Sequence, residues 1–111
     1  MAVHEILIHA PIGASFWDEG ITSKAVLDRL ALAAPGDTIL VRINSPGGSA
    51  FDGLAIANAL RRHPGDVTTL VEGAAFSAAS VIAMGGKKRL ASPTAMLMIH
   101  RSRGYAMGGV T

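Results

Sequence analysis

Three short segments of this chain contain the residue types that acyl transfer requires. Residues 44–48 form a loop with two adjacent glycines, residues 73–80 form a small-residue turn with a serine, and residues 96–100 form an apolar strand ending in a histidine. A glycine loop can expose backbone N–H groups to an oxyanion, a serine can act as nucleophile, and a histidine as general base. The three segments together predict a hydrolase site.

The glycine loop follows residues 38–43, a β-branched run that predicts a buried parallel strand. Pro46 fixes φ, while Gly47 and Gly48 allow backbone angles and close approaches that a Cβ would prevent. Open α/β sheets bind ligands at the carboxyl ends of their strands. We therefore predict that the Gly47 or Gly48 amide contributes to an oxyanion hole; the alternative is an ordinary strand-to-helix turn.

Ser77 follows a predicted strand at residues 67–71 and a turn through Gly73, and it stands at or near the start of a helix. This place exposes the hydroxyl and makes the Ala78 amide a second candidate oxyanion donor. His100 follows the strand predicted at 95–99, so it and Ser77 are expected at the same edge of the sheet. The alternatives are a helix-capping serine and a solvent-exposed histidine.

Hydrophobic periodicity predicts an α/β fold in which strands alternate with helices in βαβ units. The expected strands are residues 5–9, 38–43, 67–71, 89–91 and 95–99. One helix is expected from Thr22 or Ser23 to the turn at 35–37, with Val26, Leu27, Leu30 and Ala34 on one face. The other two are expected from Asp52 to Arg62 and over residues 75–84.

Composition narrows the possible classes of protein. The 111 residues suffice for one domain, expected to span 1–111, and 50% of them are hydrophobic, which favours an oligomer over a monomer. Only 5% are aromatic, so no nucleic-acid partner is expected. There is no cysteine, the four histidines lack metal-ligand spacing, and no apolar run could span a membrane. We expect a cytoplasmic protein with no metal and no cofactor.

The three segments, in this order and spacing, resemble the ClpP peptidase family, and within it the ClpP-like head maturation (prohead) proteases of tailed phages. The matching segments are residues 42–56, 71–84 and 92–100, and Ile12-Gly13 and Gly20-Ile21-Thr22 also suit the phage branch. The resemblance implies a crotonase-like superfold and a serine endopeptidase assembled into rings around a chamber. It also implies protein or peptide substrates, either capsid or scaffold proteins in a procapsid, or proteins fed by an AAA+ unfoldase in a bacterial host.

Carried over by position, the resemblance implies that Ser77 is the nucleophile and His100 the general base, with oxyanion donors at Gly47, Gly48 and Ala78. The family's triad acid lies downstream of the histidine, beyond this sequence, so relative to the family the chain is expected to be C-terminally truncated. Phe76 stands where such proteases have a small residue, and it is expected to narrow the pocket.

Three other functions are compatible with parts of this pattern. Acyl-CoA enzymes of the crotonase group share the superfold and a similar oxyanion hole, but they need neither Ser77 nor His100 at these positions. Serine–lysine peptidases would require Lys87 or Lys88 to approach Ser77, and nothing in the sequence directs either lysine there. The non-enzymatic alternative is a degenerate, catalytically inactive subunit that forms rings or assists capsid assembly.

Overall fold

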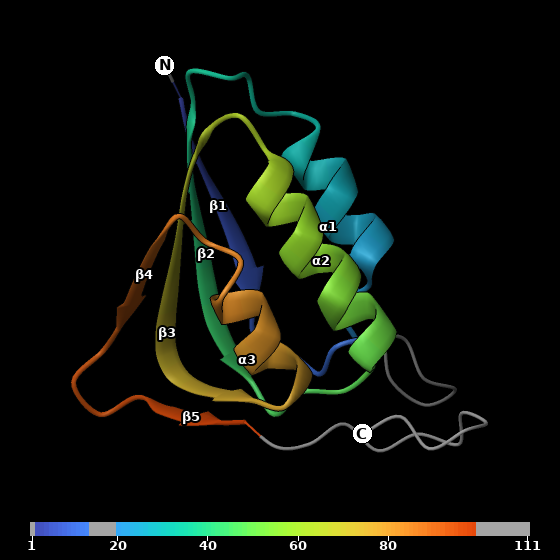
Figure 1. Ribbon diagram of the computed structural model, residues 1–111, viewed down its shortest axis with the longest axis vertical. Helices are drawn as coiled ribbons and strands as arrows, with labels where there is room; N and C mark the ends of the chain where they lie inside the picture. The colour runs from blue at the N-terminus through green and yellow to red at the C-terminus, as the bar shows by residue number, and fades with distance from the viewer. Residues whose placement is uncertain (1, 14–19, 100–111) are drawn as a thin grey trace.

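The computed structural model describes residues 2–13 and 20–99, which form a five-stranded parallel sheet with three helices on one side of it (Figure 1). The strands run in the order β1-β2-β3-β4, and β5 pairs with the end of β3. The strands are β1 Val3–Ile8, β2 Thr38–Ser45, β3 Asp66–Phe76, β4 Lys88–Ala91 and β5 Met96–Met98. The helices are α1 Ser23–Leu30, α2 Ala50–Arg62 and α3 Ala78–Ala83. The predicted α/β class with a parallel sheet is confirmed.

The core lies between the sheet and the helices. Alternate side chains of the three long strands face the helices and are buried, whereas their neighbours on the other face are half-buried or exposed. The inward positions include Ile8, Ile39, Val41, Ile43 and Val67, all 0% exposed, and Ile56, Leu60 and Ile82 of the helices meet them. This alternation follows from the two-residue period of a strand with one covered face.

The boundaries of α1 and α2 differ from the sequence prediction. Helix α1 begins after Thr22, whose side chain accepts from Ala25 N as expected, but it ends at Leu30 rather than at residues 35–37. The residues after α1 are fixed instead by Asp37, whose carboxylate accepts a hydrogen bond from Ala34 N. Helix α2 is capped by Ser49, not by Asp52, which lies in the first turn and donates its N–H to the Ser49 hydroxyl.

Strand β3 is longer than predicted, and α3 is correspondingly shorter. Ala75 and Phe76 were expected in the helix over 75–84, yet they are strand residues paired with Leu97 and Met98 of β5. Ala75 also pairs with Ser45 of β2. Pairing on both edges overrides the weak strand propensity of this alanine-rich stretch.

Candidate active site

Ser77 lies between the end of β3 and the start of α3, in a backbone conformation that few residues adopt. Its φ is 56° and its ψ −120°, and within the described residues no other non-glycine residue has a positive φ. Such a conformation costs about 1–3 kcal/mol and persists only where neighbouring contacts hold it. One contact is the hydrogen bond that Ser77 N donates to Met98 O at 2.8 Å. The turn is therefore strained and held from β5.

The Ser77 hydroxyl is not used to cap α3, although serine at the start of a helix commonly has that role. The following residue, Ala78, is 5% exposed and begins the helix. Among the hydrogen bonds between described residues, none uses Ala78 N as donor. Within residues 2–13 and 20–99, the Ser77 hydroxyl and the Ala78 amide thus have no recorded hydrogen-bond partner.

The glycine loop packs directly against Ser77. Gly47 has a φ of 100° and Gly48 a φ of 147°, conformations that favour glycine. A Cβ on Gly47 would lie 2.5 Å from Phe76 O and 3.0 Å from Ser77 Cβ. The predicted oxyanion loop and the predicted nucleophile are thus adjacent at the carboxyl ends of β2 and β3.

The two glycine amides differ in what they contact. Gly47 N donates to the Ser45 hydroxyl at 3.1 Å, and Ser45 is 1% exposed. Ile12 forms a parallel bridge with Gly48, in which Ile12 N donates to Gly47 O and Ser49 N donates to Ile12 O. In such a bridge the central residue's own N–H faces the opposite side. Gly48 N consequently points away from Ile12, and no acceptor for it occurs among the residues described.

The buried hydroxyl of Ser45 is a feature that the sequence analysis missed, although its position inside the motif at 44–48 was a signal. As an acceptor two residues before Gly47, it fixes the first turn of the loop. It also removes the Gly47 amide from solvent contact. Gly48 is exposed, so its amide is the accessible one of the two.

His100 lies outside the described residues, and its expected approach to Ser77 stays a prediction. Strand β5 ends at Met98, two residues before it, rather than at residue 99. The contact from Ser77 N to Met98 O joins this strand to the serine turn. The chain immediately before the predicted base is therefore held beside the predicted nucleophile.

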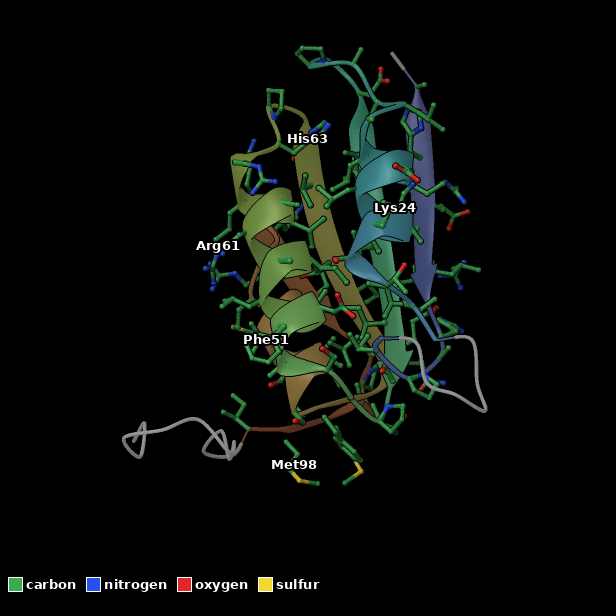
Figure 2. The ribbon with its side chains drawn as sticks, turned by 90° about the vertical axis from the view of Figure 1, so that its right-hand side faces the viewer. Lys24, Phe51, Arg61, His63 and Met98 are labelled. Carbon is green, nitrogen blue, oxygen red and sulfur yellow. The ribbon has the colours of Figure 1, made fainter. Side chains whose placement is uncertain are left out.

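Exposed apolar side chains gather at the same end of the molecule. Phe51, in the first turn of α2, is 89% exposed, and on the strand side Met96 and Met98 are 63% and 48% exposed. Phe51 and Met98 both lie toward the end where the glycine loop is found, opposite His63 (Figure 2). Phe76, expected to narrow the pocket, is half-buried and pairs with Met98.

The groups with shifted pKa values lie away from Ser77. Backbone N–H groups of Ala2 and Ala34, and then His4, hold the pKa of Asp37 far below its usual range, at the amino end of β2. The Arg42 guanidinium, 2.6 Å from Glu72 Oε2, lowers the pKa of Glu72. Neither carboxylate is placed to orient a histidine beside Ser77 by any contact the structure records.

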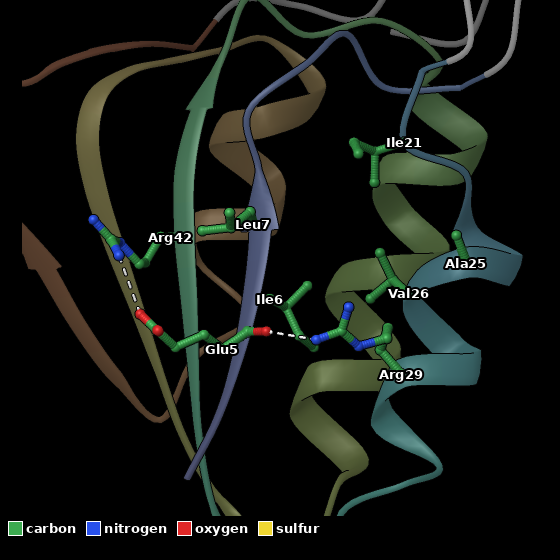
Figure 3. A pocket seen from close by; sticks show the side chains of 8 residues that line it. All are labelled: Glu5, Ile6, Leu7, Ile21, Ala25, Val26, Arg29 and Arg42. Carbon is green, nitrogen blue, oxygen red and sulfur yellow. Dashed lines mark hydrogen bonds and ion pairs between the residues drawn. The ribbon is translucent and has the colours of Figure 1, made fainter.

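A hollow of about 340 Å³ lies elsewhere, between the free edge of β1 and helix α1 (Figure 3). Arg29 crosses it and donates to Glu5 O at 3.0 Å, and Ile21 and Val26 form its apolar wall. Across residues 2–13 and 20–99 no cluster of potential metal ligands is found, and no helix there has the length and apolarity to cross a bilayer.

These features define the class of protein: a parallel α/β fold of the ClpP-like type, with a strained serine next to a glycine loop. The Clp protease family model matches residues 4–111, and the chain belongs to that family. Relatives include ATP-dependent Clp protease proteolytic subunits of Bacteroides fragilis, Bacteroides thetaiotaomicron and, as subunit 1, Chlamydia caviae, at 42%, 40% and 36% identity.

Each alignment covers 78% of this chain, but only 43%, 40% and 49% of the respective relative. The chain thus spans less than half the length of these curated relatives.

Proposed function

We propose that this chain provides the nucleophile and oxyanion hole of a serine endopeptidase, in one domain spanning 1–111. The observation that carries the proposal is the contact between the glycine loop and Ser77, whose φ of 56° is maintained at an energetic cost. The names of the relatives, which are proteolytic subunits, support the same activity.

In the proposed mechanism, Ser77 Oγ attacks the scissile carbonyl carbon while the imidazole of His100 accepts the hydroxyl proton. The carbonyl oxygen becomes an oxyanion that receives hydrogen bonds from Gly48 N and Ala78 N. His100 then donates the proton to the leaving amine as the peptide C–N bond breaks. Water, deprotonated by the same imidazole, hydrolyses the acyl-enzyme and releases the second product.

Of the three donors expected from the sequence, the proposal gives Gly47 a supporting role. Its amide already donates to Ser45, so it shapes the loop, while Gly48 and Ala78 supply the two amides. No metal or cofactor has a part in this chemistry. The orienting carboxylate of a triad would come from a segment beyond the residues described.

We further propose a homo-oligomeric ring whose substrates are unfolded proteins or peptides delivered by an AAA+ unfoldase in the bacterial cytoplasm. The words "ATP-dependent" in the relatives' names support this partner. Capsid or scaffold cleavage in a phage procapsid is the second candidate. It rests on the resemblance of Ile12-Gly13 and Gly20-Ile21-Thr22 to the phage branch.

A fluorophosphonate probe tests the proposed nucleophile in protein whose assembly is verified by native mass spectrometry. We expect labelling of the wild type, none of Ser77→Ala, and strongly slowed labelling of His100→Ala. Ser92→Ala, a serine on the β4–β5 connection, is the matched control and should label at the wild-type rate. A folded, assembled wild type that does not label would favour the inactive ring-forming subunit instead.

The two substrate classes are separated by the requirement for ATP. Degradation of a folded reporter only in the presence of a Clp-type unfoldase and ATP would support the first. Cleavage of a scaffold protein at defined sites without ATP would support capsid maturation.

A further inference from the structure

The pairing between β2 and β3 changes register just before the proposed site. Ile43 pairs with Val71, and the next paired residues are Ser45 and Ala75. Asn44 alone therefore stands opposite three residues of β3: Glu72, Gly73 and Ala74. An irregularity of this kind bends the longer strand and re-aims the residues after it.

The side chain of Asn44 occupies the irregularity. Its Oδ1 accepts a hydrogen bond from Ala74 N at 3.0 Å, an amide that the shifted register leaves without a ladder partner on β2. Gly73 accommodates the side chain, since a Cβ at that position would lie 2.5 Å from Asn44 Oδ1. The asparagine and the glycine therefore fit one another sterically.

The shift determines how far Ser77 lies along the sheet. Had the pairing of Ile43 with Val71 continued in register, Ala75 would stand opposite Gly47, and Ser77 would lie two residues further on, about 6.6 Å at the usual strand rise. The shift instead places Ser77 beside Gly47, whose Cβ would be 3.0 Å from Ser77 Cβ. On the opposite edge of β3, Phe76 pairs with Met98 of β5.

We propose that Asn44 is a positioning residue for the nucleophile: by accepting the Ala74 amide it maintains the register shift that brings Ser77 to the glycine loop. On the opposite edge, strand β5 holds the end of β3 and Ser77 through the hydrogen bond from Ser77 N to Met98 O. This inference rests on the proposed role of Ser77, and its test has one readout that does not depend on that role.

The first experiment compares Asn44→Ala with Asn44→Asp, which retains an oxygen acceptor for Ala74 N. We expect Asn44→Ala to slow fluorophosphonate labelling of Ser77 about 10- to 100-fold, as misplacement by an ångström or more does in other sites. Asn44→Asp should recover most of the rate. Asn58→Ala, which removes an exposed asparagine from α2, should leave the rate unchanged.

The second readout is amide hydrogen exchange, which requires no activity. Protection of the Ala74 amide should fall in Asn44→Ala and persist in Asn44→Asp, while the Val41 and Leu70 amides within the sheet keep their protection in both. A loss of protection throughout the sheet would instead reveal general destabilisation, and it would contradict a local role for Asn44.

A double-mutant cycle with Gly73→Ala sharpens the test. The added methyl group would displace the Asn44 side chain, so Gly73→Ala alone should slow labelling about as much as Asn44→Ala. In the Asn44→Ala background the same substitution should have little further effect, because the side chain that it displaces is already absent. Additive effects would contradict the proposal.

The possible failures are distinguishable. If the wild type does not label but Ala74 loses protection only in Asn44→Ala, the role of Ser77 as nucleophile is wrong while the contact of Asn44 with Ala74 stands. If the wild type labels and Asn44→Ala labels equally fast with Ala74 still protected, the positioning role is overturned while the peptidase proposal survives.

Discussion

The two ends of the parallel sheet are built differently. At the amino end of β2, the Asp37 carboxylate accepts from Ala2 N, Ala34 N and His4 Nε2, each at 2.9 Å. At the carboxyl end, Ser77 has a strained backbone, and neither Ala78 N nor Gly48 N donates to an acceptor among the described residues. The polar groups named at the first end are paired, whereas the two amides at the second end have no acceptor within the described residues.

Under the proposed function, the first end contributes to stability and the second to chemistry. The Asp37 carboxylate accepts three hydrogen bonds, which fix β1 and the connection after α1 without imposing backbone strain. A serine at positive φ lowers stability, and the sheet tolerates it because the residues before it are paired on both edges, Ala75 with Ser45 and Phe76 with Met98. Substitutions at the two ends should therefore have different, separable effects.

The largest effect is expected from Gly47→Ala, which should lose both stability and reactivity. A Cβ there would overlap Phe76 O, and the φ of 100° is unfavourable for alanine. We expect a loss of about 2–4 kcal/mol in the free energy of unfolding, and labelling of Ser77 reduced at least a hundredfold. Urea denaturation and probe kinetics measure the two effects, with Gly36→Ala in an exposed turn as control.

At the other end, Asp37→Asn should lower thermal stability at pH 7 without changing the labelling rate of Ser77. The pKa of Asp37 is lower in the folded state than in the unfolded state, so ionisation of Asp37 stabilises the fold above the unfolded pKa. That contribution disappears as the pH falls. The difference in melting temperature between wild type and Asp37→Asn should therefore narrow below about pH 4.

A change in the labelling rate of Asp37→Asn at pH 7, with the protein still folded, would mean that the two ends are coupled. A melting-temperature difference that stays constant from pH 7 to pH 2 would contradict the assigned role of the ionised carboxylate.

A smaller effect on stability is expected from two substitutions of Ser77, which separate the cost of its backbone strain from the loss of its hydroxyl. Both Ser77→Gly and Ser77→Ala remove the hydroxyl, so neither should label, but glycine adopts positive φ without the steric cost of a Cβ. We expect Ser77→Gly to be more stable than Ser77→Ala by about 1 kcal/mol. Equal stabilities in denaturant titrations would show that the turn is not strained.

The smallest effect on stability is expected from Phe51→Ser, since the ring is 89% exposed. The free energy of unfolding should change by no more than about 0.5 kcal/mol. If Phe51 contacts substrate, KM for apolar peptides should rise severalfold while kcat changes little. Leu32→Ser, at an exposed apolar residue in the connection after α1, is the control that should change neither constant.

Much of the fold was predictable because its strands are β-branched and its turns contain glycine and proline. The strand at 38–43, the glycine loop and the place of Ser77 near the start of a helix all follow from such local signals. The capping by Thr22 was likewise predictable from residue type. The local sequence pattern was sufficient to predict structure wherever the type of a single residue determines its conformation.

The features that the sequence could not provide depend on contacts between distant segments. Ala75 and Phe76 resemble the start of a helix, yet pairing with β2 and β5 makes them strand. The register shift at Asn44 has no periodic signature, because a period of two is the same before and after a displacement of two residues. The placement of His100, outside the described residues, stays a prediction.

The bridges that Ile12 forms with Ile21 and Gly48 bear on how the length of the neighbouring chain segment can change. Gly13 N donates to Ile21 O and Ile21 N donates to Pro11 O, so the residues on either side of 14–19 are hydrogen-bonded to one another. A Cβ on Gly20 would overlap Gly13 O, so no side chain fits there. Lengthening a loop whose ends are already fixed costs only about 0.6 kcal/mol per doubling. A change in the number of residues between Gly13 and Gly20 would thus leave the glycine loop in its position against Ile12.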